Sequence, residues 1–219
     1  MTEQGSAQSE NGQDVAQGGY LASAEFSTML DRLGAVAART GLNVAPGQQV
    51  ILTAPLSAVP LVRRITEHAY KAGASLVTTF YSDDEATLAR YKYAAEPTFD
   101  TAAGWLAQGM AEGFRAGAAR MAVTGSNPTL LAGQNPDHVS RASRAASAVN
   151  RPAMEIITTF AVNWCIVAAA TPPWASQVFP DLPPDQSLDA LWQAIFSFSP
   201  LTGAYPVADS SPPNALHTR

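Results

Sequence analysis

Phe160–Phe196 reads FAVNWCIVAAATPPWASQVFPDLPPDQSLDALWQAIF, and this stretch decides the fold. Its apolar run Trp164–Ala170 is short and contains β-branched residues, which predicts a buried strand. Thr171-Pro172-Pro173 ends that strand, because proline donates no backbone hydrogen bond and fixes its own φ. A second turn follows at Pro180-Asp181. A helix is then predicted from Asp185, with its apolar side recurring at Leu188, Leu191, Trp192, Ile195 and Phe196. Because these large rings need a core built by other segments, we expect the stretch to form the last structured layer.

Strand and helix patterns alternate in the first part of the chain. Apolar residues between Phe26 and Ala37 recur at helical spacing, and Gly41 is placed to end that helix in a left-handed conformation. A strand is predicted at Gln49–Ala54, a helix capped by Ser57 or a neighbour and stopped by Gly73, and a second strand at 75–81. A strand, a helix and a strand in quick succession form a βαβ unit with parallel pairing and a right-handed crossover.

The same alternation continues toward the stretch quoted first. The predicted elements are a helix starting at Asp83-Asp84-Glu85, a connection over Ala94–Asp100, a helix through Leu106, Met110 and Phe114, a strand at Met121–Thr124, a turn at Gly125-Ser126-Asn127-Pro128, a helix capped by Asn135 that runs to about Val149, and a connection over Arg151–Thr159. This order predicts the α/β class: an open, mostly parallel, doubly wound sheet with helices on both faces.

Composition excludes several classes of protein. Hydrophobic residues make up 47% of the 219 residues and charged residues 14%, which indicates a buried core. A net charge of −5 argues against a nucleic-acid-binding surface. No apolar run reaches the length of a membrane span, and Met1–Gly19 lacks the basic start and apolar middle of a secretory signal. Cys165 is the only cysteine, and its place in the apolar run predicts a buried, inert thiol. We therefore expect a soluble cytoplasmic protein with no nucleic-acid or membrane partner.

Four motifs together resemble a known family. They are the order strand, T-P, W-A, V-F-P-D and helix ending L-W-x-A-I-F in the stretch quoted first, GLNVAPGQQVILTAP at Gly41–Pro55, AYKAGASLV at Ala69–Val77, and TGSNPTLLAGQNPDH at Thr124–His138. In this order they resemble the amino-terminal domain of the thermophilic-type metallo-aminopeptidases, the family of aminopeptidase T, aminopeptidase S and PepS. The resemblance runs from about Leu21 to Phe196 and covers one half of such an enzyme.

The resemblance implies a division of the chain into three parts. Residues 1–19 are rich in Gln, Gly, Ser and Glu and are expected to be a disordered leader. Residues 20–197 are expected to be the α/β amino-terminal domain of a metallo-aminopeptidase. Residues 198–219 are expected to be an irregular tail, in which Tyr205–Asp209 resembles the family's link to a second domain. A frameshifted or truncated reading frame, a cloning boundary or natural decay of the gene would each explain that tail.

The resemblance also implies a reaction. Members of the family release amino-terminal residues from peptides with two divalent metal ions (cobalt, zinc or magnesium), where a metal-bound water attacks and a carboxylate relays its proton. Their ligands, two glutamates, two histidines and an aspartate, lie in the carboxy-terminal half. We therefore predict no catalytic and no metal-binding residue in this chain, which alone should be inactive and bind no such ion. Its substrate-binding residues are unknown. The family's homodimer contacts are expected mostly in the missing half.

Residues that could form a separate metal site have simpler interpretations. His68 lies beside Glu67 without an H-E-x-x-H pair, which favours a solvated or partly packed side chain. His138 beside Asp137 fits helix capping and dipole contacts, and His217 lies in the tail. The acidic trio Asp83–Glu85 fits a helix start after a strand.

Other binding and catalytic motifs are absent or weak. The loop Pro55-Leu56-Ser57 after the first strand has no glycine to cradle a pyrophosphate. The turn 125–128 lies where α/β sheets bind ligands, but a plain turn explains it. Cys165 has no activating neighbour in sequence, and Trp164, Trp174 and Trp192 fit core or interface packing better than a substrate cleft. Two alternatives remain open: a free-standing module that binds a small anionic ligand at the strand ends, and a decayed remnant without function.

Overall fold

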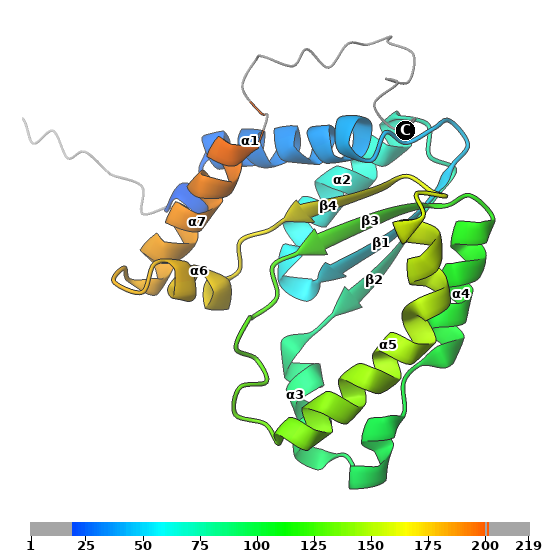
Figure 1. Cartoon of the computed structure of the whole chain (residues 1–219). Helices are drawn as coiled ribbons and strands as arrows, with labels where there is room; N and C mark the ends of the chain where they lie inside the picture. The colour runs from blue at the N-terminus through cyan, green and yellow to red at the C-terminus, as the bar shows by residue number, and fades with distance from the viewer. Residues whose placement is uncertain (1–18, 200, 202–219) are drawn as a thin grey trace, which may run out of the picture.

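The protein is built on one four-stranded parallel sheet. The computed structural model describes residues 19–199 and residue 201. The strands are β1 (Gln49–Pro55), β2 (Leu76–Ser82), β3 (Ala119–Thr124) and β4 (Trp164–Ala168), and they lie in the order β2-β1-β3-β4. Every adjacent pair is parallel (Figure 1). The predicted open parallel sheet is confirmed.

Helices cover both faces of this sheet, as the doubly wound prediction requires. They are α1 (Ala24–Ala35), α2 (Val59–Lys71), α3 (Asp84–Tyr93), α4 (Gly104–Arg115), α5 (Pro136–Thr158), α6 (Pro172–Val178) and α7 (Pro184–Phe198), with short turns η1 (Tyr20–Ala22), η2 (Val36–Gly41), η3 (Leu56–Ala58) and η4 (Glu96–Asp100). The larger core joins α1, α2 and α7 to one face, and a smaller one lies under α4 and α5. No helix in the described residues is long and apolar enough to cross a membrane.

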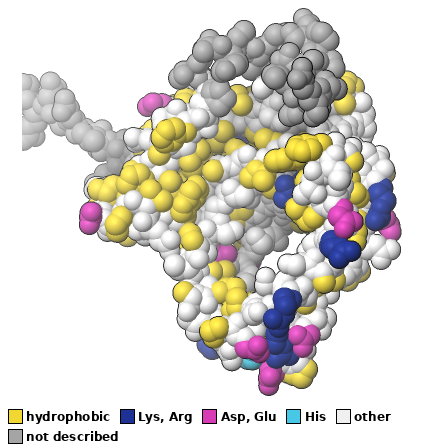
Figure 2. Space-filling view, viewed as in Figure 1, with side chains coloured by type: hydrophobic (Ala, Val, Ile, Leu, Met, Phe, Trp, Pro, Cys, Tyr) yellow, Lys and Arg dark blue, Asp and Glu magenta, His cyan; other side chains and the backbone are white. Residues whose placement is uncertain are grey.

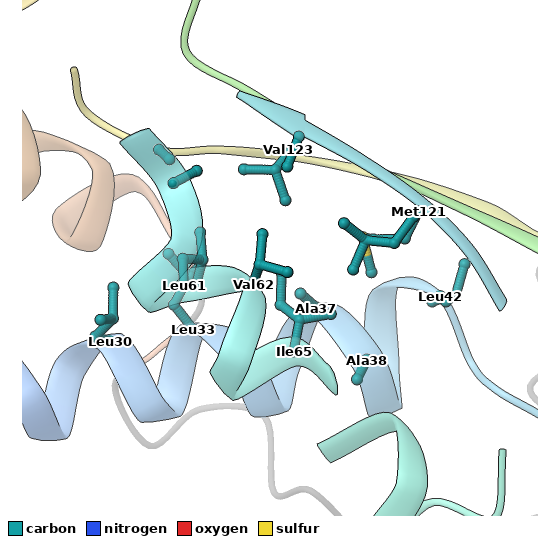
Figure 3. Packing of buried hydrophobic residues seen from close by; sticks show 14 of the residues in the cluster. Leu30, Leu33, Ala37, Ala38, Leu42, Leu61, Val62, Ile65, Met121 and Val123 are labelled. Carbon is teal, nitrogen blue, oxygen red and sulfur yellow. The ribbon is translucent and has the colours of Figure 1, made fainter. Parts of the chain in front are cut away.

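The alternation of side chains along β1 builds both cores. Val50 and Leu52 point to α1 and α2 and are almost fully buried, whereas Ile51 between them packs against the α4–α5 cluster. Figure 3 shows the first side, where Ile65 and Val62 of α2 lie beside Met121 of β3. A strand buried on both faces cannot slip in register without exposing one set of apolar residues.

The stretch Phe160–Phe196 packs on α1 through aromatic rings. Phe26 of α1 meets Trp192 of α7 edge to face at 5.4 Å between ring centroids, and it meets Phe196 at 5.8 Å. Trp192 and Phe196 are both buried. This geometry fits the electrostatics of aromatic pairs, which favour tilted over face-to-face contact. The expected last layer is therefore fixed to the beginning of the described chain (Figure 1).

The predicted end of the first helix was wrong in detail. Gly41 is not in a left-handed conformation, which Asn43 adopts instead, with φ of 52°. Helix α1 continues into the π-helical turn η2, which includes Gly41. A side chain there would collide with the sulfur of Cys165, because a Cβ placed on Gly41 lies 2.7 Å from it. The glycine is thus needed for close packing and not for its left-handed freedom.

Two helical segments were missed. The predicted connection 151–159 is the continuation of α5, which passes through Pro152 and ends at Thr158. Burial of Ala153 and Ile157 against α4 offsets the backbone hydrogen bond that a proline removes. Residues Pro172–Val178 form α6, where proline in the first turn starts a helix as well as ending a strand. The predicted side-chain cap of α2 is also absent, because Ala58 occupies the N-cap position.

The prediction of a buried strand at Trp164–Ala170 also needs correction. β4 ends at Ala168 and lies at the edge of the sheet, and Ile166 remains 51% exposed. An apolar run indicates a strand but does not say whether both of its faces are covered. The predicted leader and tail lie outside the described residues, apart from residues 19, 198, 199 and 201.

A network of side-chain hydrogen bonds connects the amino ends of three strands. Gln48, just before β1, donates from Nε2 to the carbonyl of Gly117 (2.8 Å) and to Oδ1 of Asn163 (2.7 Å). Asn163, just before β4, donates from Nδ2 to the carbonyl of Leu42 (2.7 Å). These bonds satisfy polar groups of the loops, which form no hydrogen bonds within the β-sheet.

We expect Asn163→Ala to lower the free energy of unfolding by about 1–3 kcal/mol, because partly buried partners lose their hydrogen bonds. Urea denaturation measures this change. Asn150→Ala is the matched control: its exposed side chain only bonds the carbonyl of Ala146 within α5, and its effect should stay within about 0.5 kcal/mol. Equal effects of the two substitutions would show that the hydrogen bonds of Asn163 add no stability of their own.

Candidate functional site

A crevice of about 380 Å³ lies at the carboxyl ends of the strands. It is lined by Pro55–Ser57 at the end of β1, Ser82–Glu85 at the end of β2, Gly125 after β3 and Thr171–Pro173 after β4. The chain leaves β1 toward α2 on one face and, further on, leaves β3 toward α5 on the other, so the direction reverses between these neighbouring strands. Parallel α/β sheets bind ligands at such a reversal. The crevice is therefore the candidate site.

A buried hydrogen bond and close backbone packing form the floor of the crevice. Thr171 is buried, and its Oγ1 donates to the carbonyl of Gly125 at 2.6 Å. Gly125 admits no side chain, because a Cβ there would overlap the carbonyl oxygen of Ala169. The predicted turn at 125–128 is thus a tight junction between β3 and the end of β4. In the sequence, the Thr-Pro-Pro that ends the apolar run marks the end of β4. It does not indicate that Thr171 bonds to Gly125.

The acidic trio forms one wall. Asp83 caps α3 by accepting from the backbone N–H of Glu85 (2.8 Å) and of Ala86 (3.2 Å), which confirms the predicted helix start. Asp84 and Glu85 carry two further carboxylates to the same wall, and no lysine or arginine lines the crevice. Its charge suits an amine or another cation and disfavours a phosphate. In Figure 2 the face is hollowed below its centre, and one acidic patch lies at the edge of the hollow.

A second hollow of about 600 Å³ continues from the crevice between α3 and α5, and both share Ser82 and Asp83. Its lining is otherwise made of Ala86, Thr87, Arg90, Tyr91, Leu131, Val139, Ala142, Ser143 and Ala146. Helix α3 buries none of its residues. Its position depends on the turn η4: Arg90 donates to the carbonyls of Thr98 and Thr101, and Tyr91 stacks on the buried Phe99.

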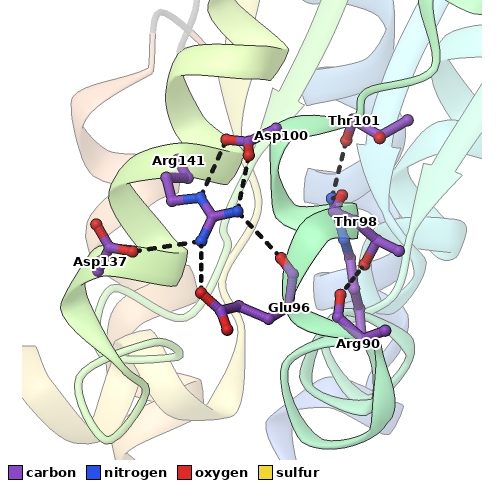
Figure 4. A network of polar contacts seen from close by, with 8 residues as sticks. Arg90, Glu96, Thr98, Asp100, Thr101, Asp137 and Arg141 are labelled. Carbon is purple, nitrogen blue, oxygen red and sulfur yellow. Dashed lines mark hydrogen bonds and ion pairs between the residues drawn. The ribbon is translucent and has the colours of Figure 1, made fainter.

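One arginine clamps η4 to α5. Arg141 donates to both carboxylate oxygens of Asp100, at 3.0 and 2.7 Å, and to carboxylates of Glu96 and Asp137 (Figure 4). Its hydrogen bond and charge hold the pKa of Asp100 below its usual range, and the same contacts raise the pKa of Arg141. Sequence reasoning missed this clamp, since its members are some 40 residues apart and only the fold brings them together.

The two histidines in the described part of the chain do not converge. His138 stacks on Phe99 with ring centroids 4.3 Å apart, in place of the capping role predicted for it. His68 is buried between α1 and α2, packed as predicted but not solvated, and its Nε2 lies 3.1 Å from Oδ1 of Asp31. His217 lies outside the described residues. Among residues 19–199 and 201, no three His, Cys, Asp or Glu side chains are grouped to hold a metal ion.

Cysteine and tryptophan side chains also lie apart from the crevice. Cys165 is partly buried against the larger core, and burial raises the pKa of its thiol, which fits the predicted inert role. Trp192 and Trp174 pack in or against that core, as predicted. Trp164 is instead partly exposed on β4.

Comparison with known proteins identifies relatives along most of the chain. Residues 26–212 match the profile of the thermophilic metalloproteases (M29). Aminopeptidase T of Thermus thermophilus is 45% identical over 195 residues, which are 89% of this chain and 48% of that protein. Aminopeptidase AmpS of Bacillus subtilis is 33% identical over 83% of this chain and 44% of its own length. The solved structure of wild-type AmpT from Thermus thermophilus superposes with a TM-score of 0.78 at 47% identity, covering 80% of this chain and 44% of that one. The chain thus spans less than half the length of these relatives.

We expect Thr171→Val to destabilise the protein by about 1–3 kcal/mol, because the near-isosteric change leaves the buried carbonyl of Gly125 without a donor. Thermal and urea unfolding measure the loss. Thr124→Val serves as the control: Thr124 is exposed, and its Oγ1 lies a long 3.5 Å from the carbonyl of Val167. A loss no larger than that of the control would show that the crevice floor does not depend on this bond.

The Arg141 clamp predicts a pH dependence. The pKa of Asp100 is lowered in the folded state, so its contribution to stability is present above the ordinary aspartate value of about 4 and is lost as pH falls through the lowered value. The difference in unfolding free energy between wild type and Asp100→Asn should therefore be largest near pH 7 and shrink toward pH 3. Asp181→Asn, which removes an exposed carboxylate with no ion pair to a described residue, should show no such trend.

Proposed function

The chain belongs to the family of thermophilic metalloproteases (M29), and on that premise we propose that it is the amino-terminal α/β part of a metal-dependent aminopeptidase. The reaction is the release of amino-terminal residues from peptides by metal-assisted hydrolysis. The observation that carries the proposal is the match over residues 26–212 together with relatives that are named aminopeptidases. Because the matches cover less than half of those relatives, the activity of the whole enzyme is part of the proposal.

The described residues do not fit the metal centre of such an enzyme. A site for two divalent ions needs several carboxylates and imidazoles converging on both, and the described part of the chain groups no three such side chains. We propose that the two ions, cobalt, zinc or magnesium, bind residues supplied by the other half of the enzyme. The 219-residue chain alone is then inactive.

The role proposed for this part is to shape one wall of the substrate cavity and to limit access to it. The crevice and the adjoining hollow are the described surfaces that suit such a wall, and the carboxylates that line the crevice are compatible with the free amino group of a peptide. We further propose that the enzyme acts in the cytoplasm as a homodimer, with most subunit contacts in the other half.

A second candidate function is a free-standing module for a small ligand. The crevice at the reversal between β1 and β3 favours it, since such positions bind ligands in many α/β proteins. The carboxylates argue against the nucleotide or sugar phosphate that such sites commonly hold. Thermal-shift measurements with these compounds distinguish the two candidates, because a site-specific ligand raises the melting temperature by mass action.

We expect no hydrolysis of aminoacyl-arylamides by the purified 219-residue protein with cobalt, zinc or magnesium added. Aminopeptidase T of Thermus thermophilus, assayed under the same conditions, is the positive control. Turnover above the buffer rate that is removed by a chelator and restored by metal would overturn the proposed division of roles. Equilibrium dialysis of the three ions provides a second measurement, in which binding near one equivalent per chain would have the same consequence.

A further inference from the structure

The outer edge of β4 has free backbone groups. Arg120 donates its N–H to the carbonyl of Asn163, and Ala169 donates to the carbonyl of Thr124. In a parallel ladder each residue bonds to one neighbouring strand with both its N–H and its C=O, and this property alternates along the strand. Cys165 and Val167 therefore bond to β3, whereas Trp164 and Ile166 direct their backbone groups away from the sheet. Within the described residues no strand pairs with this edge.

The same residues carry exposed apolar side chains. Trp164 is 37% exposed and Ile166 51%, and Phe160, at the turn before β4, is 71% exposed. The rings of Phe160 and Trp164 stack with centroids 6.2 Å apart. Phe160 adopts φ of 56°, a left-handed conformation that is rare for an aromatic residue and costs about 1–2 kcal/mol. Strained backbone and exposed aromatic residues are typical of ligand sites and protein–protein interfaces.

A cation with no partner among the described residues lies on the same face. Arg120 of β3 is the register partner of Trp164 on one side and of Ile51 on the other, so the three side chains point to the same face of the sheet. Arg120 is partly buried, and its guanidinium forms no ion pair or hydrogen bond with any other described residue. Burial lowers the pKa of Arg120, the sign of a charge that has lost water without gaining a counter-ion. A carboxylate would supply that counter-ion.

We propose that the β4 edge, defined here by Phe160, Trp164, Ile166 and Arg120, is a docking surface for an extended segment of another polypeptide. The segment adds a fifth strand to the sheet, covers the apolar side chains and sets a carboxylate against Arg120. Backbone pairing of this kind is a general mode of peptide recognition, in which alternate side chains give the specificity. In Figure 1 no helix lies in front of β4, and Figure 2, in the same view, shows hydrophobic side chains across that region.

The opposite edge of the sheet provides a comparison. β2 is also an edge strand, and its Leu76 is 47% exposed. Among residues 19–199 no aromatic stack involves β2, and the register partner of Leu76 on β1 is the uncharged Gln49. Charge and ring composition therefore favour β4 as the edge that takes a partner. Docking at this edge does not depend on the proposed aminopeptidase function, since it concerns binding and not turnover.

The test uses synthetic eight-residue peptides of alternating valine and threonine with one central glutamate, and their binding to the full 219-residue chain is followed by fluorescence anisotropy. The glutamate peptide should bind about tenfold more tightly than its glutamine counterpart, as expected for one charge-assisted hydrogen bond. Arg120→Gln should remove that preference. Arg63→Gln, at an exposed position of α2 across the sheet, should leave it unchanged.

Backbone pairing is tested separately with N-methylated peptides. Methylation of alternate amides on one edge of the peptide should abolish binding, while methylation of the other edge should leave it within about threefold, because only one edge can face β4. Ile166→Lys should weaken binding, and Leu76→Lys should not; circular dichroism checks that both variants fold.

Three results would overturn the proposal. They are absence of binding by the glutamate peptide, equal binding of the two methylated forms, and weakening by Leu76→Lys as strong as that by Ile166→Lys. Self-association of the chain in sedimentation experiments, lost in Ile166→Lys, would assign the edge to a second copy and would also overturn it.

Discussion

Burial of β1 and β3 on both faces is the constraint on which the rest of the structure depends. Val50 and Leu52 on one face and Ile51 on the other must all leave water, so a helical layer is needed on each side. The chain can supply two layers only by leaving neighbouring strands in opposite directions. That reversal opens the crevice at the carboxyl ends of the strands. The candidate site is thus a consequence of how the core is covered, before any polar residue is considered.

The strand pattern could be predicted from the sequence because it reflects this burial, and all four strands were predicted to within a few residues of their observed bounds. The errors arose where tertiary contact overrides local signals. Gly41 is required because a side chain there would collide with the sulfur of Cys165. Helix α5 continues through Pro152 because Ala153 and Ile157 are buried. In the candidate site, Asp83 was correctly predicted as a helix start. The contact from Thr171 to Gly125 and the clamp of Arg141 could not be predicted, since their partners are distant in sequence.

The floor of the site and its α3 wall are held in place by different interactions. The floor, formed by Thr171 and Gly125, is continuous with the buried sheet and is held by the hydrogen bond between them. Helix α3 buries nothing and is held through η4 by stacking on Phe99 and by the ion pairs of Arg141. Exposed ion pairs are weak singly, but three carboxylates share one guanidinium here. The width of the hollow between α3 and α5 therefore depends on the ion pairs of Arg141 as well as on the stacking of Tyr91 and His138 on Phe99.

The charge of the crevice bears on what it can accept. Helices α2, α3 and α6 begin at its rim, and each amino terminus contributes about half a positive charge. Three such ends amount to roughly one and a half positive charges, and the carboxylate of Asp83 already offsets part of this by capping α3. Asp84 and Glu85 add two further negative charges that no lysine or arginine of the lining compensates. The balance is negative, so the helix ends that attract phosphate in many α/β proteins are outweighed here. A ligand with a free amino group fits this balance.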